Sequence, residues 1–178
     1  MIIDFNTYII EKKDNQPKEI IFLVGPPGIG KSTYINKFLK QNPDKEYYIV
    51  SNDIIVEEFA KKWNLNYQDS FMKLDINYKK YLFDKRLKKA IRNNMSIIID
   101  NTNVKKSERL NVLSMIPNYY IKKAIVFNYD PIEMRKRLDK RYKLTGKFIP
   151  QEVTDMFIKS YTEPTKAEGF DKILHVNI

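Results

Sequence analysis

The chain has 178 residues, the size of one ordinary domain, and 43% of them are hydrophobic, which is enough for a substantial core. It has no cysteine and a single histidine, which excludes disulfides, cysteine-ligated zinc, thiol nucleophiles and multi-histidine metal sites. Lys and Arg outnumber Asp and Glu by 32 to 22, and the net charge of +10 either attracts a polyanion such as nucleic acid or reflects a lysine-rich composition throughout.

The N-terminal segment, residues 2–10, is a candidate edge strand of a sheet. Asp4 and Glu11 stand where a signal peptide carries basic residues, and no apolar run approaches the ~20 residues of a membrane span. We therefore expect a soluble protein of the cytoplasm or another intracellular compartment, with no membrane partner. A single domain is expected over residues 1–178, with residues 1–18 as an N-terminal extension.

Short β-branched runs alternate with stretches of helical period, which is the pattern of an α/β domain built on a parallel sheet. Each predicted core strand is nearly continuous in apolar residues, as a strand covered on both faces should be. These strands are residues 20–24, 47–50, 96–100 and 122–127, and residues 172–176 are a candidate edge strand. We expect a parallel sheet of four to five strands flanked by helices.

Periodicity and capping signals predict three helices. Apolar side chains recur on one face of residues 78–93, while lysines occupy most of the rest. Asp130 followed by Pro131 is a cap with a proline at the first helical position, so a helix begins there. Pro150 opens another helix, which runs to about residue 161.

A basic stretch lies between the last two helices. Residues 143–149 contain Gly146 at their middle, and we interpret residues 136–149 as a mobile, basic lid region. Arg137 and Arg141 lie one helical turn apart, just before the basic stretch at 143–149, so both could point at phosphates and neutralise charge in a transition state. The alternative is an ordinary solvated face of a basic helix.

The turn between the first strand and the first helix carries a phosphate-binding motif. Residues 25–32 read GPPGIGKS, which is G-x-x-x-x-G-K-S in the expected strand–turn–helix context. Backbone N–H groups of such a loop cradle phosphates, Lys31 reaches the transferred phosphate and Ser32 offers a hydroxyl to Mg²⁺. The sequence therefore predicts binding of ATP, or another nucleoside triphosphate, with Mg²⁺. The predicted contacts are Gly25, Pro26, Pro27, Gly28, Ile29, Gly30, Lys31, Ser32 and Thr33.

Acidic residues follow the next two strands, at the sheet edge where ligands of open α/β folds bind. Asp53 comes just after the second strand, where its carboxylate could take the proton of an acceptor hydroxyl; it could equally cap the following helix. Asp100 ends the third strand in the Walker-B pattern, able to hold Mg²⁺ through water or to fix Ser32. The alternative for Asp100 is a turn acid that caps backbone groups.

Several motifs together resemble one family. They are GPPGIGKST at 25–33, SND ending at Asp53, IIIDNTN at 97–103 followed by Arg109, RKRLDKR at 135–141, IP at 149–150 and YTEPTKAEGF at 161–170. From residue 20 onward the chain resembles polynucleotide 5′-hydroxyl kinases, both the phage enzymes and the kinase half of the eukaryotic DNA-end-repair phosphatase/kinase. The tail at 161–170 is especially similar to the eukaryotic members.

The resemblance implies a P-loop kinase fold with a basic lid and ATP-dependent phosphorylation of a 5′-hydroxyl end of DNA or RNA. Asp53 matches the family's general base, and Lys31 and Ser32 match its phosphate and metal contacts. Arg141 matches a lid arginine of the family, and so do Arg137 and Arg135. The resemblance assigns Arg141 and Arg137 to catalysis and Arg135 to binding of the nucleotide. Asp100 and Asn103 match a DxTN-type signature, and together with Arg109 this assigns Asp100 to the metal and Asn103 and Arg109 to the substrate.

The sequence departs from this family at three points. The stretch between Asp53 and Asp100, including Trp63 and residues 67–80, is about as long as in the phage enzymes but does not match them residue by residue. Phage members carry an arginine three positions after the base to hold the acceptor's phosphate, but Val56 stands there, so the resemblance does not supply this chain's anchor for the acceptor. Nothing resembles the phosphatase partner's aspartate nucleophile motif, so no 3′-end cleaning is expected.

Two other functions share the same loop. A P-loop small-molecule kinase, or a toxin-like kinase acting on a nucleoside or nucleotide sugar, needs no basic channel. A nucleotide-dependent binding module would use the loop without phosphoryl transfer. Salt dependence separates a polynucleotide kinase from a small-molecule kinase, because oligonucleotide binding weakens steeply with salt and small-substrate binding much less.

Overall fold

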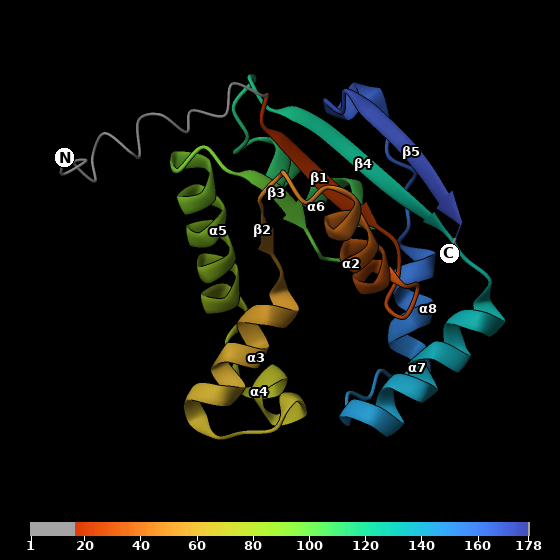
Figure 1. Ribbon diagram of the computed structural model, residues 1–178. Coiled ribbons are helices and arrows are strands. Elements are labelled where there is room, and N and C mark those ends of the chain that lie inside the picture. The colour runs from red at the N-terminus through yellow and green to blue at the C-terminus, as the bar shows by residue number, and fades with distance from the viewer. Residues whose placement is uncertain (1–16, 178) are drawn as a thin grey trace.

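The computed structural model describes residues 17–177 and shows a five-stranded parallel sheet (Figure 1). Its strands are β1 (Glu19–Val24), β2 (Tyr47–Val50), β3 (Ser96–Ile99), β4 (Ile121–Asn128) and β5 (Lys172–Asn177). The spatial order is β2-β3-β1-β4-β5, with every pair parallel. The predicted α/β class and parallel sheet are confirmed, whereas the candidate strand at residues 2–10 lies outside the described residues.

Seven α-helices and one short 3-10 helix connect the strands within the described residues. They are α2 (Lys31–Gln41), α3 (Asn52–Trp63), α4 (Tyr67–Lys73), α5 (Ile76–Arg92), α6 (Lys106–Leu113), α7 (Pro131–Thr145), α8 (Gln151–Lys159) and the 3-10 helix η1 (Lys166–Glu168). None of them is long and apolar enough to cross a membrane.

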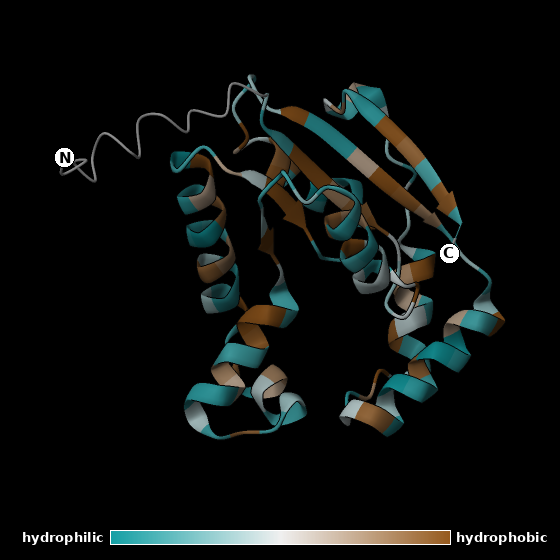
Figure 2. Cartoon of the chain, viewed as in Figure 1, coloured by the Kyte–Doolittle hydropathy of each residue, from teal (hydrophilic) through white to brown (hydrophobic). Residues whose placement is uncertain are grey.

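The central strand β1 and its neighbour β3 are buried and mostly apolar on both faces because helices cover both faces of the sheet there, whereas the edge strand β5 is mostly exposed. On β1, Ile21 and Leu23 pack with Ile35 of α2 on one side of the sheet. Ile20 and Phe22 face the opposite side, where the core is completed by apolar residues of α3, α5 and α6. Figure 2 shows the central strands mostly brown and α7 mostly teal, consistent with a buried sheet and a polar, peripheral α7.

Local capping fixes where the helices begin. The Asp130 carboxylate accepts a hydrogen bond from the backbone N–H of Ile132, and Pro131 occupies the first turn of α7 as predicted. The boundary at the other end differs from expectation: α7 continues to Thr145, so the predicted lid is mainly helix. Gly146, with φ 70°, ends α7 in a left-handed cap that most side chains disfavour.

Two helical arms project beyond the carboxyl ends of the strands. Figure 1 shows α3 and α4 on one side and α7 on the other, with the loop between β1 and α2 lying between them. Because β1 is the central strand and its two neighbours continue to different helices, this is the edge where an open parallel sheet binds ligands.

Candidate active site

The loop between β1 and α2 is shaped by close packing against α7. Gly28 has φ 80°, and a Cβ at this position would lie 2.6 Å from Cγ of Leu138, so both conformation and space require glycine. Arg137 of the same helix donates a hydrogen bond from Nη1 to the carbonyl of Ile29, at 3.1 Å. The loop ends at Gly30, the N-cap of the 11-residue helix α2, whose first N–H groups form an anion-binding terminus.

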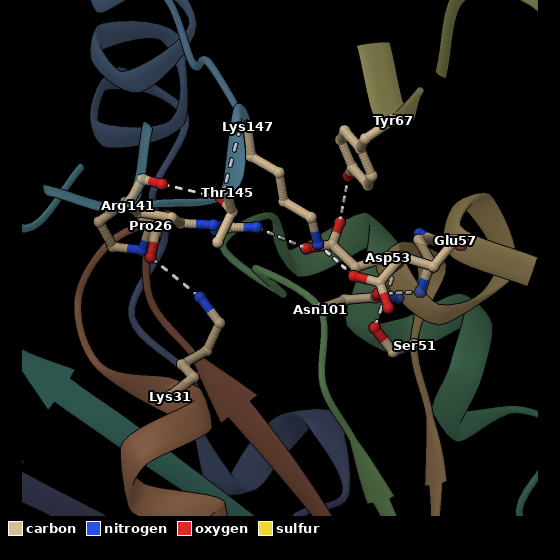
Figure 3. A network of polar contacts seen from close by, with 11 residues as sticks. Pro26, Lys31, Ser51, Asp53, Glu57, Tyr67, Asn101, Arg141, Thr145 and Lys147 are labelled. Carbon is tan, nitrogen blue, oxygen red and sulfur yellow. Dashed lines mark hydrogen bonds and ion pairs between the residues drawn. The ribbon is translucent and has the colours of Figure 1, made fainter. Parts of the chain in front are cut away.

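Lys31 folds back onto the loop in this structure. Its Nζ donates to the carbonyls of Gly25 at 2.8 Å and Pro26 at 2.9 Å (Figure 3). Burial lowers the pKa of the Lys31 ammonium to about 8, against the opposing charges of Asp100 and Asp53, which raise it. The desolvated ammonium of Lys31, together with the backbone N–H groups at the start of α2, forms a set of donors suited to a polyphosphate.

A divalent ion at this site would depend on few protein ligands. No group of three or more Asp, Glu, His or Cys side chains able to hold a metal occurs within residues 17–177. The hydroxyl of Ser32 is exposed at the start of α2, and Asp100 is half-buried just after β3. Burial raises the pKa of the Asp100 carboxyl, partly offset by Lys31. These two residues fit Mg²⁺ held mainly by triphosphate oxygens and water, as is usual for this small, strongly hydrated ion.

Asp53 does not cap its helix. The N-cap of α3 is the buried Ser51, whose Oγ accepts a hydrogen bond from the backbone N–H of Asp53 at 3.2 Å. The Asp53 carboxylate instead accepts from the hydroxyl of Tyr67 at 2.8 Å and from Nη2 of Arg141 at 3.3 Å (Figure 3). Since 54% of its side chain stays exposed, the carboxylate remains accessible to a further ligand.

The structure brings Lys31, Asp53, Asp100 and Arg141 into one electrostatic group, because the last three all shift the pKa of Lys31. They come from α2, α3, the end of β3 and α7, elements far apart in the sequence. Arg137 and Arg141, predicted to point at phosphates together, make different contacts: Arg137 donates to the P-loop carbonyl of Ile29 and Arg141 to the carboxylate of Asp53. Arg135 is directed elsewhere: its Nη1 donates to Oε1 of Gln151 at 2.9 Å and its Nε pairs with Asp139.

Two residues beside Asp53 were not foreseen from the sequence. Tyr67 opens α4, in a stretch that the family resemblance does not align, and burial together with the charge of Asp53 raises the pKa of its hydroxyl. Lys147 follows α7, pairs with Glu57 and holds its ammonium 4.4 Å from the centroid of the Tyr67 ring. Its place in the predicted lid was the only sequence signal for Lys147.

The expected substrate contact by Arg109 is wrong, because its side chain is fully buried. The guanidinium makes two hydrogen bonds of 2.8 Å to the carboxylate of Glu168 and donates to the carbonyls of Asn103 and Val104. Arg109 therefore fastens the loop after β3 to the C-terminal segment around η1. This role explains the tail motif at 161–170, which the sequence associated with the family but not with a contact.

Asn103 also lies in the core and not at a substrate surface. It is 3% exposed, and its Nδ2 donates to the carbonyls of Leu23 at 2.8 Å and Ile99 at 3.2 Å. The neighbouring Thr102 accepts from the backbone N–H of Gly25 at 2.8 Å. The expected substrate contact of Asn103 is replaced by a bracing role, since these bonds hold the start of the P-loop against the end of β3.

Val56, at the position of the phage arginine, is 1% exposed and belongs to the core. No side chain at this position could reach an acceptor without leaving the core of α3. Two cations from other parts of the chain lie near this position: Arg141 donates to the Asp53 carboxylate, and Lys147 pairs with Glu57 and covers the ring of Tyr67.

Glu168→Ala is expected to destabilise the fold strongly. Removing the partner leaves the Arg109 guanidinium buried and unpaired, which costs about 3–5 kcal/mol of unfolding free energy. Urea denaturation followed by circular dichroism measures this difference. The matched control is Glu133→Ala, which breaks an exposed pair with Lys136 and should cost less than about 1 kcal/mol. Equal stabilities of the two variants would contradict the bracing role of Arg109.

A P-loop between the central strand and α2 of a parallel sheet, with a basic helix packed on the loop, defines a domain with the P-loop kinase fold. Residues 20–164 match the family AAA_33, described as an AAA domain, and the chain belongs to this family.

Three similar proteins differ in their described roles. The chain is 32% identical to an L-seryl-tRNA(Sec) kinase of Methanococcus maripaludis over 85% of its length and 56% of the relative's. It is 24% identical to human heterogeneous nuclear ribonucleoprotein U-like protein 2 over 88% of its length and 21% of the relative's. A chain in the structure of the Pnkp1/Rnl/Hen1 RNA repair complex matches with TM-score 0.66 and 25% identity over 84% of this chain and 46% of that one. The chain thus spans about half or less of each of these proteins.

Proposed function

We propose that this protein is an ATP-dependent polynucleotide 5′-hydroxyl kinase that transfers the γ-phosphate to a 5′-OH end of DNA or RNA. One observation carries the proposal: the accessible carboxylate of Asp53 is oriented by Tyr67 and Arg141 and lies within the electrostatic field of Lys31. A base placed beside the lysine of a P-loop suits transfer to a hydroxyl. The similar chain in the RNA repair complex and the tRNA kinase support a nucleic-acid acceptor.

When bound, ATP supplies the phosphoryl group and Mg²⁺ offsets the negative charge on its oxygens. Lys31 exchanges the carbonyls of Gly25 and Pro26 for phosphate oxygens, and Arg141 leaves Asp53 for the charge that develops on the transferred group. Asp53 then orients the 5′-hydroxyl and takes its proton late, as the oxygen bonds to phosphorus and the bond to the leaving diphosphate breaks.

The deciding experiment measures transfer of label from γ-labelled ATP to a 5′-OH oligonucleotide, with a 5′-phosphorylated oligonucleotide as the blocked control. Labelling of the first alone is expected, and the Michaelis constant for the oligonucleotide should rise steeply with salt. Transfer to a nucleoside or nucleotide sugar with little salt dependence would instead favour a small-molecule or toxin-like kinase. ATP binding without transfer to any acceptor would favour a binding module.

A second acceptor class is favoured by the 32% identity to the L-seryl-tRNA(Sec) kinase: a hydroxyl group carried by tRNA. The same Asp53 would serve as base, because a carboxylate can take the proton of either hydroxyl. Comparing seryl-tRNA with uncharged tRNA bearing a 5′-OH as acceptors separates the two classes. Phosphate that is released with the aminoacyl group would identify the seryl acceptor.

Arg141→Ala is expected to lower kcat by about 10²-fold with little change in oligonucleotide affinity, because the guanidinium acts on charge that develops in the transition state. Steady-state kinetics at saturating ATP and fluorescence anisotropy of a labelled oligonucleotide measure the two quantities. The matched control is Arg135→Ala on the same helix, whose side chain contacts Gln151 and Asp139. A loss confined to oligonucleotide affinity would make Arg141 an acceptor-binding residue instead.

A further inference from the structure

Two aromatic rings form a row that leads away from Asp53 along α4. Tyr67 and Phe71 lie one helical turn apart, with ring centroids separated by 6.4 Å and planes inclined by only 23°. The hydroxyl of Tyr67 contacts Asp53, so one end of the row touches the proposed base. The other end, Phe71, is 50% exposed.

A lysine ammonium lies over each ring. Lys147, from the segment after α7, is 4.4 Å from the centroid of Tyr67, and Lys79 of α5 is 4.7 Å from that of Phe71. The two cations therefore come from separate parts of the chain, and each ring of the row has one cation over it. Figure 3 shows the first of these units, with Tyr67 and Lys147 converging on Asp53 and Glu57.

Two further apolar side chains near Phe71 in the sequence are exposed. Met72 and Ile76, at the junction of α4 and α5, are 72% and 71% exposed. Tyr67 is half-buried against the core, so the exposed part of the row is Phe71 with Met72 and Ile76, a candidate binding surface beside two cations. The charges present are the complement of phosphate, and the ring faces are the complement of a nucleobase.

We propose that the aromatic–lysine row, made of Tyr67, Phe71, Lys79 and Lys147, binds the first nucleotides of a single-stranded nucleic acid. This rests on the proposed function in placing the 5′-hydroxyl at Asp53. The first two bases stack on Tyr67 and Phe71, while Lys147 and Lys79 swing from the ring faces to the phosphates that follow each nucleoside. Lys147 thereby takes the anchoring role that the buried Val56 does not perform.

The row also predicts a preference for unpaired ends. A base that stacks on an isolated side chain must leave its neighbours in the strand, which a paired base in a duplex does only at the cost of unstacking. A blunt duplex should therefore be a poorer acceptor than the same strand alone.

The chain offers a matched control for Phe71 on the far side of α5. Tyr81 is 55% exposed and carries Lys85 at 5.8 Å from its ring, so it repeats the chemistry of the row. Two positions along a helix turn the side chain by about 200°, so Tyr81 points away from Lys79 and from α4. Tyr81→Ala should therefore leave acceptor kinetics unchanged.

The test compares Phe71→Ala, Tyr81→Ala and the unaltered protein with a single-stranded octanucleotide bearing a 5′-OH and with its blunt duplex. For Phe71→Ala we expect the KM for the single strand to rise about tenfold, equal to about 1.4 kcal/mol, with kcat unchanged. Thermal denaturation checks that both variants fold. An unchanged KM for the folded Phe71→Ala protein, or an equal loss in Tyr81→Ala, would overturn the proposal.

Direct binding of the labelled octanucleotide, measured by fluorescence anisotropy, separates this proposal from the proposed function. If the protein phosphorylates the oligonucleotide and Phe71→Ala changes neither KM nor affinity, the aromatic–lysine row is refuted as a binding site and the proposed kinase activity stands. The opposite outcome is an unaltered protein that binds the octanucleotide without phosphorylating it. If Phe71→Ala then weakens this binding tenfold, the result would support the aromatic–lysine row as a binding site and contradict the kinase proposal. If the unaltered protein binds no single strand, the row is refuted whatever acceptor is phosphorylated.

Discussion

Lys31→Ala is expected to lower phosphoryl transfer by at least about 10⁴-fold while the protein stays folded. The Lys31 ammonium donates to the carbonyls of Gly25 and Pro26 within the P-loop turn, and Lys31 belongs to neither apolar core cluster, so its loss should not disturb the core. Its loss removes a preorganised charge from the phosphate that is transferred. Ser32→Ala should likewise abolish transfer, by removing the hydroxyl that is offered to Mg²⁺.

The measurement is single-turnover transfer from labelled ATP at saturating acceptor, with thermal denaturation as the check on folding. Lys37→Ala is the matched control, because Lys37 is an exposed lysine of the same helix, α2. Full activity of a folded Lys31→Ala or Ser32→Ala protein would refute the assignment of the P-loop as the phosphate site.

The pKa of about 8 for Lys31 gives a second readout of the same residue. A lysine is charged below its pKa, so in the free protein the ammonium is mostly present at pH 7 and mostly lost at pH 9. ATP affinity should therefore fall as pH rises through 8, because binding must then also take up a proton. Lys31→Arg keeps its charge across this range and should lose the pH dependence, whatever its absolute affinity.

The parts of the site that sequence predicted are those encoded by short, local patterns. The P-loop is contiguous, the strands are continuous apolar runs, and the start of α7 follows from Asp130 and Pro131 side by side. Each of these signals acts within a few residues, so no knowledge of the tertiary fold is needed to interpret it.

The parts that sequence did not predict depend on partners far along the chain. Arg109 looks like a solvated helix residue until Glu168, 59 residues later, is placed against it. Likewise nothing local to Tyr67 indicates that its hydroxyl meets Asp53, 14 residues earlier, or that Lys147 covers its ring. Such contacts arise only when segments far apart in the sequence meet in the tertiary fold, which is why Asn103 and Arg109 were predicted to bind substrate although both hold loops of the fold together.

Asp53→Asn is expected to lower kcat by about 10² to 10⁴-fold while ATP still binds, because the amide keeps the shape of the side chain but is a poor proton acceptor. The structure removes the competing interpretation of Asp53 as a helix cap, since Ser51 fills that role. The half-exposed side chain also contributes little to packing, so the variant should lose less than about 1 kcal/mol of stability. Urea denaturation and kinetics on the same preparation measure both quantities.

The matched control is Asp75→Asn at the start of α5, where the carboxylate does cap the helix by accepting from the backbone N–H of Tyr78. Asparagine caps about as well as aspartate, so this variant changes the charge in the same way and should keep its kcat at saturating acceptor. Near-normal turnover by a folded Asp53→Asn protein would rule out the proposed base. The acceptor would then have to be activated by another group, and Tyr67 and Arg141, which both donate to the Asp53 carboxylate, would be the first to test.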